Sequence, residues 1–125
     1  MPAIATNAAI TVLVVDDDAL TLMAAVMTVE GAGYTVVSAC DAAAAMQALR
    51  QNAQIAALFT DIQMPGLMNG LALAHEAHLL WPALHILLTS GDTSPTSADM
   101  PHDGQFLRKP YTPNQVLGML GAMLA

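Results

Sequence analysis

The stretch ITVLVVDDD, residues 10–18, decides the fold class of this chain. A short run rich in β-branched residues is followed without a break by three aspartates, Asp16, Asp17 and Asp18. Such a run is typical of a strand that is buried on both faces of a parallel sheet. We therefore expect the aspartates to stand at the carboxyl end of that strand, which is where sheets of this kind bind ligands.

The alternation of strand and helix continues along the whole chain. Because strands and helices alternate, we predict an α/β fold with a five-stranded parallel sheet and helices on both faces. The predicted strands are 10–15, 34–39, 55–60, 85–89 and 105–108. The predicted helices begin at Ala19, after Asp41, at Gly70 and after Thr112, where Thr112, Pro113 and Gln115 form a capping box.

Apolar spacing predicts which face of each helix is buried. The predicted inner positions are Leu20, Met23, Ala24 and Met27 in the first helix, Ala42, Ala45, Met46 and Leu49 in the second, and Leu73, Ala74, Ala77 and Leu80 in the third. Cys40, after the second strand, is predicted to fill a small core position. Residues 90–104 (SGDTSPTSADMPHDG) contain two prolines and no apolar stripe, so the fourth helix is expected to be short or absent there.

Composition limits the classes of function. A chain of 125 residues fits one domain, and a hydrophobic share of 55% with only 10% charged residues predicts that some apolar surface stays exposed. Three Lys and Arg against ten acids give a net charge of -7, which argues against direct nucleic-acid binding. No apolar stretch reaches the roughly 18 residues of a membrane span, and the start lacks the basic residues of a signal peptide. We expect a cytoplasmic protein with no membrane insertion.

Five side chains that could bind a ligand or react lie at the same edge of the predicted sheet. Each stands at the carboxyl end of a strand, and together they are Asp16, Asp17, Asp61, Thr89 and Lys109. None of them is specific alone, since aspartates before a helix are more often N-caps. Together, three converging carboxylates repel one another unless a hard divalent cation such as Mg²⁺ lies among them. A carboxylate beside Mg²⁺ and a lysine can attack phosphorus.

Four motifs, VLVVDDD, FTDIQMPG, LLTSG and FLRKPY, resemble in order and spacing the signatures of response-regulator receiver domains of the CheY-like family. The resemblance covers 10–124 and implies a flavodoxin-like strand order of 2-1-3-4-5. Residues 1–9 are then an N-terminal extension and residues 10–125 a single receiver domain. The loop 61–70 looks one residue longer than in the chemotaxis regulator.

Carried over to this chain, the resemblance implies a role for each site residue. Asp61 would be the phosphoacceptor, and Lys109 would pair with a phosphoryl oxygen. Asp17, Asp61 and the Gln63 backbone carbonyl would bind Mg²⁺ directly, with Asp16 acting through a metal-bound water. Thr89 and Phe106 would form the conformational switch. The Lys109–Pro110 bond would be cis.

The implied partner is a histidine kinase or a histidine phosphotransfer protein, and the domain would catalyse its own phosphorylation and dephosphorylation rather than act as a turnover enzyme. It would stand alone or be the detached receiver of a hybrid kinase. The alternative is a receiver-fold binding module that takes no phosphate. A haloacid-dehalogenase-like phosphatase is disfavoured, because Leu20 stands where that family expects threonine.

The first and last helices also predict an interface. In the last helix Val116, Leu117, Met119, Leu120, Met123 and Leu124 leave almost no polar face, and in the first we expect Leu22, Val26 and Val29 to point outward. A shared apolar patch of this kind would mark an interface for phosphotransfer docking or for a homodimer.

Overall fold

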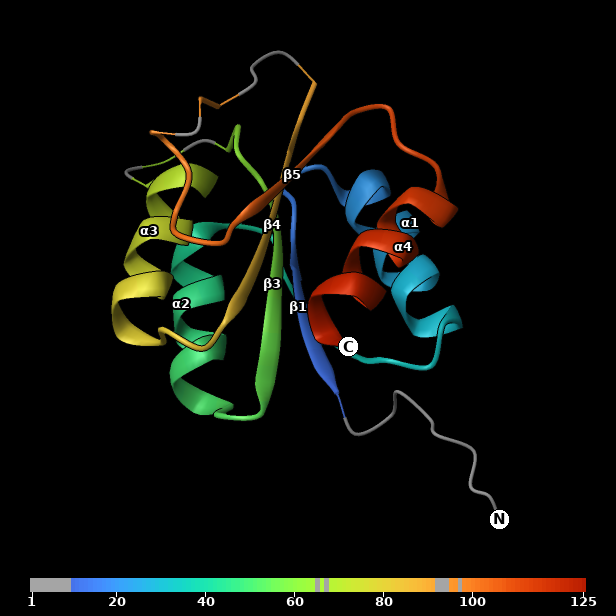
Figure 1. Ribbon diagram of the computed structural model, residues 1–125, viewed down its shortest axis with the longest axis horizontal. Helices are drawn as coiled ribbons and strands as arrows, with labels where there is room; N and C mark the ends of the chain where they lie inside the picture. Colours follow the sequence, from blue (N-terminus) through green and yellow to red (C-terminus); the bar gives the residue numbers. More distant parts are fainter. Residues whose placement is uncertain (1–9, 65, 67, 92–94, 97) are drawn as a thin grey trace.

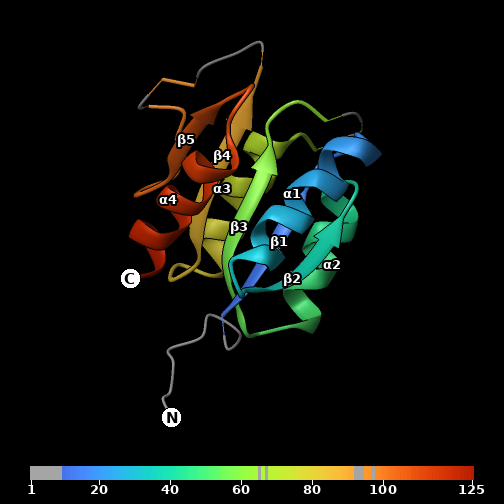
Figure 2. The ribbon, with the colours of Figure 1, turned by 90° about the vertical axis from the view of Figure 1, so that its right-hand side faces the viewer.

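The computed structural model describes residues 10–64, 66, 68–91, 95–96 and 98–125. Its elements, in chain order, are β1 Thr11–Val15, α1 Ala19–Gly31, β2 Thr35–Ala39, α2 Ala42–Gln51, β3 Ile55–Asp61, α3 Gly70–Leu80, β4 His85–Ser90, β5 Gln105–Arg108 and α4 Pro113–Leu124. The five strands form one sheet in the order β2-β1-β3-β4-β5, and every pairing is parallel (Figure 2). The predicted fold class and strand order are confirmed.

The sheet is covered on both faces, as Figure 1 shows. Helices α2 and α3 pack on one face around Leu58, Leu73 and Leu88, and α1 and α4 pack on the other around Phe59 and Leu120. Strands β1, β3 and β4 are almost wholly buried, because each has a neighbour on both sides and helices above and below. This burial explains their nearly continuous apolar sequences.

Each helix begins at a side chain that caps its free backbone amides. The N-caps are Asp18 for α1, Asp41 for α2, Asn69 for α3 and Thr112 for α4, each accepting a hydrogen bond from an amide of the first turn. The predicted capping box of Thr112 and Gln115 is present. The caps fix where each helix starts relative to the strand before it, and so place the loops at the carboxyl edge of the sheet.

The predicted inner face of α1 is wrong. Leu20, Met23 and Met27 are 78%, 59% and 65% exposed, whereas Ala25 and Val29 are buried under the helix. Because α1 is apolar on all sides, its spacing could not select the buried face, and a small and a β-branched residue fit the sheet more closely than leucine and methionine.

The same rotation of α1 removes the patch predicted between the first and last helices. Leu22, Val26 and Val29 do not point outward; they belong to the core cluster shared with α4. Val116 and Leu120 are buried, and Met119 is half-buried beside them. Val116 and Leu120 of α4 therefore face the core, whereas Leu117, Met119, Met123 and Leu124 stay partly exposed.

Two smaller expectations also fail. Cys40 is exposed rather than in the core, because it follows the end of the edge strand β2. Leu80 is 50% exposed at the last turn of α3, whereas Leu73, Ala74 and Ala77 are buried as predicted. The buried face predicted for α2 is confirmed at all four positions.

The connection from β4 to β5 contains no helix among its described residues. Asp99 closes a short turn there, with its carboxylate accepting from the Thr96 amide and hydroxyl. The backbone carbonyl of Asp99 lies 2.6 Å from Nε2 of His75 on α3. The predicted absence of a regular fourth helix holds for this part of the chain, and the predicted N-terminal extension, 1–9, lies outside the described residues. None of the described helices is long and apolar enough to cross a membrane.

Candidate functional site

The centre of the site is an ion pair between the ends of β3 and β5. Asp61 is the last residue of β3 and is 7% exposed. Nζ of Lys109, directly after β5, donates to Oδ2 of Asp61 at 3.0 Å, while Oδ1 accepts from the Gln63 amide at 3.0 Å. Both carboxylate oxygens of Asp61 thus accept a hydrogen bond, and these bonds fix the side chain at the carboxyl edge of the sheet.

Asp16 adds a second buried carboxylate next to this pair. It is 4% exposed, and its two oxygens accept from Nζ of Lys109 at 3.2 Å and from the Asp18 amide at 2.9 Å. Burial raises the pKa of Asp16 and outweighs the hydrogen bond from Asp18 and the charge of Lys109, which lower it. The ion pair therefore compensates only part of the desolvation of Asp16.

The three consecutive aspartates have different surroundings. Asp17 is exposed, yet a carboxylate oxygen of it lies within 4.8 Å of oxygens of Asp16 and Asp61. Asp18 turns away and accepts from the amide and hydroxyl of Thr21 at 2.8 and 2.6 Å, and these hydrogen bonds lower its pKa. The helix-capping interpretation is correct for Asp18, and the other two join the cluster.

The donor set of this cluster fits Mg²⁺. Three carboxylates against one ammonium leave two negative charges uncompensated, and a divalent cation matches both that charge and the oxygen ligands. Burial lowers the pKa of Lys109, but the hydrogen bond to Asp61 and the charge of Asp16 overcome this effect and raise it. Lys109 is therefore a permanent cation at this site.

Thr89 lies beside Asp61 in the neighbouring strand. The two residues are register partners in the β3–β4 pairing, and the Ile62 amide donates to the Thr89 carbonyl at 2.8 Å. Thr89 is 2% exposed, and its hydroxyl has no hydrogen-bond partner among the described residues. A buried hydroxyl without a partner is costly and indicates a place where a further acceptor is expected.

Phe106 stands one strand further out. It pairs with Leu88 in the β4–β5 register and is half-buried against the cluster that contains Met64 and Met100. The Phe106 ring is thus partly buried against the core and partly exposed to solvent. The Lys109–Pro110 peptide bond is cis, as the resemblance implied.

Gly70, the first residue of α3, makes a contact that the sequence did not reveal. A Cβ atom at Gly70 would lie 1.7 Å from the Asp61 carbonyl oxygen and 2.8 Å from Cα of Ile62. The Gly70 amide donates to the Ile62 carbonyl at 2.8 Å. The end of β3 and the start of α3 therefore touch backbone to backbone, and the sequence signal was only that of a helix-opening glycine.

Comparisons with known proteins agree with this geometry. The response regulator receiver domain family matches residues 12–120. The chain belongs to this family.

The chain is similar to a transcriptional regulatory protein and to several receiver proteins of known structure. The C4-dicarboxylate transport transcriptional regulatory protein DctD of Rhizobium meliloti (strain 1021) is 35% identical over 115 residues, or 89% of this chain. The match spans 24% of that protein, so this chain covers about a quarter of its length. Among solved structures, a response regulator receiver protein from Sinorhizobium medicae WSM419 is 28% identical with a TM-score of 0.87, covering 93% of this chain and 94% of its own. A receiver protein from Pseudomonas putida is 32% identical with a TM-score of 0.80, covering 90% and 95%.

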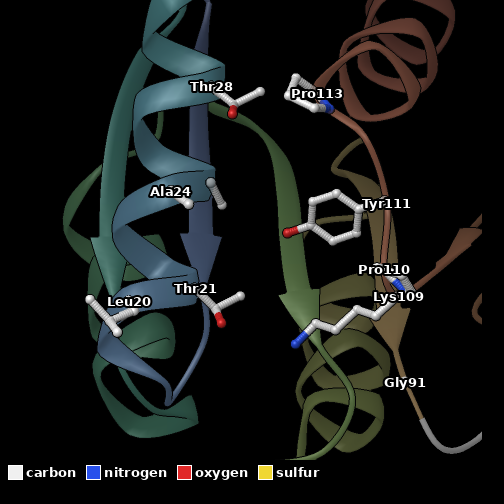
Figure 3. Close-up of a pocket in the computed structure, with 10 residues that line it drawn as sticks. Leu20, Thr21, Ala24, Thr28, Gly91, Lys109, Pro110, Tyr111 and Pro113 are labelled. Atoms are coloured by element: carbon white, nitrogen blue, oxygen red, sulfur yellow. The ribbon is translucent and has the colours of Figure 1, made fainter.

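A groove of about 720 Å³ leads along this receiver domain to Lys109. Figure 3 shows Leu20, Ala24 and Thr28 of α1 on one side and the segment after β5, with Tyr111 and Pro113, on the other. The Tyr111 ring is half-buried and lies 5.7 Å, centroid to centroid, from Phe59, and burial raises the pKa of its hydroxyl. Sequence reasoning gave Tyr111 no role, although it belongs to the FLRKPY motif.

Proposed function

We propose that this receiver domain accepts a phosphoryl group on Asp61 from a histidine kinase or a histidine phosphotransfer protein, with Mg²⁺ as cofactor. The observation that carries the proposal is the hydrogen bond from Lys109 to the buried Asp61, beside two further carboxylates. A lysine and a cation-binding cluster around one carboxylate are the groups that phosphoryl transfer requires.

The chain's own residues define the step. A carboxylate oxygen of Asp61 forms a bond to phosphorus as the bond from phosphorus to the donor's imidazole nitrogen breaks, and the imidazole leaves. Lys109, already hydrogen-bonded to Asp61, is positioned to balance charge on the transferring oxygens. The Thr89 hydroxyl, which lacks a partner among the described residues, is the donor available to the new phosphoryl group. No turnover of an external substrate is implied.

Asp17, Asp61 and the Gln63 backbone carbonyl would hold Mg²⁺, with Asp16 acting through a bound water. The cation supplies charge neutralisation for the acyl phosphate when bound. Among the three carboxylates, Asp17 is the exposed one, whereas Asp16 and Asp61 each accept from Lys109 and from a backbone amide. The exposure of Asp17 supports a direct contact between Asp17 and the cation.

In the phosphorylated state Thr89 would move toward the phosphoryl group and Phe106 would turn inward behind it. The unpartnered hydroxyl of Thr89 and the half-buried ring of Phe106 support this switch, since each gains contacts by moving. The surface that changes lies along β4 and β5, beside a connection without a regular helix in its described part.

The partner would dock on α1 and the groove beside it. The exposed Leu20, Met23 and Met27 form one stripe of α1, and Leu20 also lines the groove that reaches Lys109 (Figure 3). An apolar face on a helical bundle would cover this stripe and bring its phosphohistidine to Asp61. Self-association through α1 would use the same stripe, because Val29 is buried and Leu22 and Val26 are partly buried against the core.

A cytoplasmic location follows from the proposed partners. The match spans 24% of DctD, and we propose that this receiver domain acts either alone or as part of a longer protein such as a hybrid kinase. The competing function is a binding module that takes no phosphate. The presence of Asp61, Lys109 and the carboxylate cluster in contact geometry favours phosphorylation over it.

The test is phosphorylation by acetyl phosphate, followed by intact-mass spectrometry with and without Mg²⁺. Wild type should gain one phosphoryl group that hydroxylamine removes, whereas Asp61→Asn should gain none. Asp103→Asn, an exposed acid paired with His102, is the matched control and should label like wild type. Labelling of Asp61→Asn, or no labelling of wild type by either acetyl phosphate or a phosphohistidine donor, would reject the proposal.

A further inference from the structure

Helix α1 presents two methionine side chains to solvent, one helical turn apart. Met23 is 59% exposed and Met27 is 65% exposed, and both lie on the stripe of α1 that begins at Leu20. Ala24 and Thr28, the residues that directly follow them, line the groove that leads to the site (Figure 3). The two thioethers therefore stand beside this groove, within the surface that the proposed function assigns to the phosphotransfer partner.

The other described methionines are less accessible than this pair. Met46 and Met64 are buried, with exposed fractions of 5% and 7%. The remaining ones, on loops and on α4, are partly buried against the core and are Met68, Met100, Met119 and Met123. Because a peroxide must reach the sulfur to oxidise it, Met23 and Met27 should react first among the methionines of the described residues.

Oxidation by hydrogen peroxide changes the chemical character of the stripe. A lone pair of the thioether sulfur forms a bond to one peroxide oxygen as the O–O bond breaks. The proton of the transferred oxygen passes to the leaving hydroxide, which becomes water. Sulfur has lost two electrons, the peroxide has gained them, and the apolar thioether has become a polar sulfoxide. An apolar partner face that covers this sulfoxide must desolvate it without offering a donor, which disfavours the complex.

We propose that Met23 and Met27 form a redox-sensitive modification site, at which oxidation by peroxide weakens docking of the phosphotransfer partner. The inference rests on the proposed function, because it assigns a regulation to the same docking stripe. Neither methionine belongs to the carboxylate cluster, so oxidation leaves the reaction at Asp61 itself in place. The modification is reversible, because methionine sulfoxide reductases restore the thioether.

The experiment treats a Cys40→Ser parent protein with hydrogen peroxide and then compares two phosphodonors. Cys40 is exposed, so its replacement removes a competing thiol. Peptide mass spectrometry should find sulfoxide at Met23 and Met27 before it appears at any other described methionine. Phosphotransfer from an autophosphorylated histidine kinase should then slow by about tenfold or more, whereas labelling by acetyl phosphate should be unchanged. Treatment with the two sulfoxide reductases, one for each epimer, should restore the kinase-dependent rate.

Two double variants separate this pair from the other methionines. Leucine keeps the apolar character and nearly the volume of methionine but cannot form a sulfoxide. The variant with Met23→Leu and Met27→Leu should therefore have the same kinase-dependent rate before and after peroxide. The matched control carries Met119→Leu and Met123→Leu, which have the same spacing on α4, and should slow on peroxide treatment as much as the parent protein does.

The inference is overturned if the kinase-dependent rate is unchanged once Met23 and Met27 are oxidised. It is also overturned if other described methionines are oxidised first, or if peroxide slows the Met23→Leu and Met27→Leu variant as much as the parent protein. A parent protein that neither donor labels, before any peroxide is added, would instead reject the proposed function, and this inference with it.

Discussion

At the scale of single residues, the site is held together by one lysine shared between two buried carboxylates. Lys109 contacts Asp16 and Asp61, and the Asp16 carboxylate remains more costly to ionise in the folded chain than in water. The carboxylates of this cluster repel one another, and a divalent cation bound among them would relieve that repulsion. The position of Asp61 and the charges around it support the proposal that Asp61 is the phosphoacceptor.

The raised pKa of Asp16 gives a prediction with a defined sign. Because the folded pKa lies above the unfolded value of 3.8, ionised Asp16 lowers stability at neutral pH, and the cost is relieved as pH falls through the folded pKa. In metal-free buffer, Asp16→Asn should unfold at higher urea concentration than wild type at pH 7. The difference should shrink as pH falls toward roughly 4. A difference that is absent at pH 7, or independent of pH, would contradict the assigned cause.

Gly70 gives a second prediction at this scale. Any side chain at Gly70 must displace the backbone of Asp61. Gly70→Ala should therefore lower the free energy of unfolding by about 3 kcal/mol or more. The same substitution should slow phosphorylation by acetyl phosphate. Gly118→Ala is the matched control: Gly118 lies in α4, where an added Cβ would meet no atom within 4 Å, and alanine should stabilise the helix by about 1 kcal/mol. If the two variants were equally stable, the backbone of Asp61 could move away from residue 70 without loss of stability, and the prediction would be wrong.

At the scale of elements, the caps place the helices that support the site. Thr112 caps α4 through the Gln115 amide, and α4 carries the buried Val116 and Leu120 onto the sheet. Thr112→Ala should cost about 1 kcal/mol in urea unfolding, whereas Thr112→Ser should restore most of the loss. Thr112 is not part of the carboxylate cluster, so labelling of the folded variant by acetyl phosphate should be unchanged. A variant as stable as wild type would argue against the capping box.

The elements also show what the sequence could predict and what it could not. The strands of 10–15 and 55–60 were predictable because strands buried on both faces leave nearly continuous apolar runs that end at polar residues. The buried face of α2 was predictable because Arg50 and Gln47 mark its solvent side. The buried face of α1 was not predictable, because residues of similar hydrophobicity lie on all sides of this helix. Packing against the sheet determines which of them are buried.

The same limit applies to the site. Strand ends identify which residues meet, so the joint placement of Asp16, Asp61 and Lys109 followed from the topology alone. Backbone contacts such as that of Gly70, and the direction in which Asp18 turns, depend on loop paths that no periodicity encodes. The roles of Thr89, Phe106 and the Gln63 carbonyl stay predictions.

At the scale of the whole molecule, Mg²⁺ should stabilise the fold, because the unfolded chain has no comparable cluster of carboxylates. At 100 times its dissociation constant the gain should be about 2.7 kcal/mol, measured by urea unfolding at constant ionic strength. Asp17→Asn should lose most of this gain, and Asp103→Asn, an exposed acid outside the cluster, should keep it. A wild type indifferent to Mg²⁺ would contradict the proposed cation site.

The most direct test of the central claim is to locate the phosphoryl group itself. Wild type is incubated with acetyl phosphate and Mg²⁺ and then reduced with borohydride, which converts an aspartyl phosphate to homoserine, and the peptides are sequenced by mass spectrometry. Homoserine is expected at position 61 and at no other aspartate, and its formation should depend on both Mg²⁺ and the donor. Homoserine at Asp16 or Asp17, or an unmodified Asp61 in protein that has gained a phosphoryl group, would contradict it.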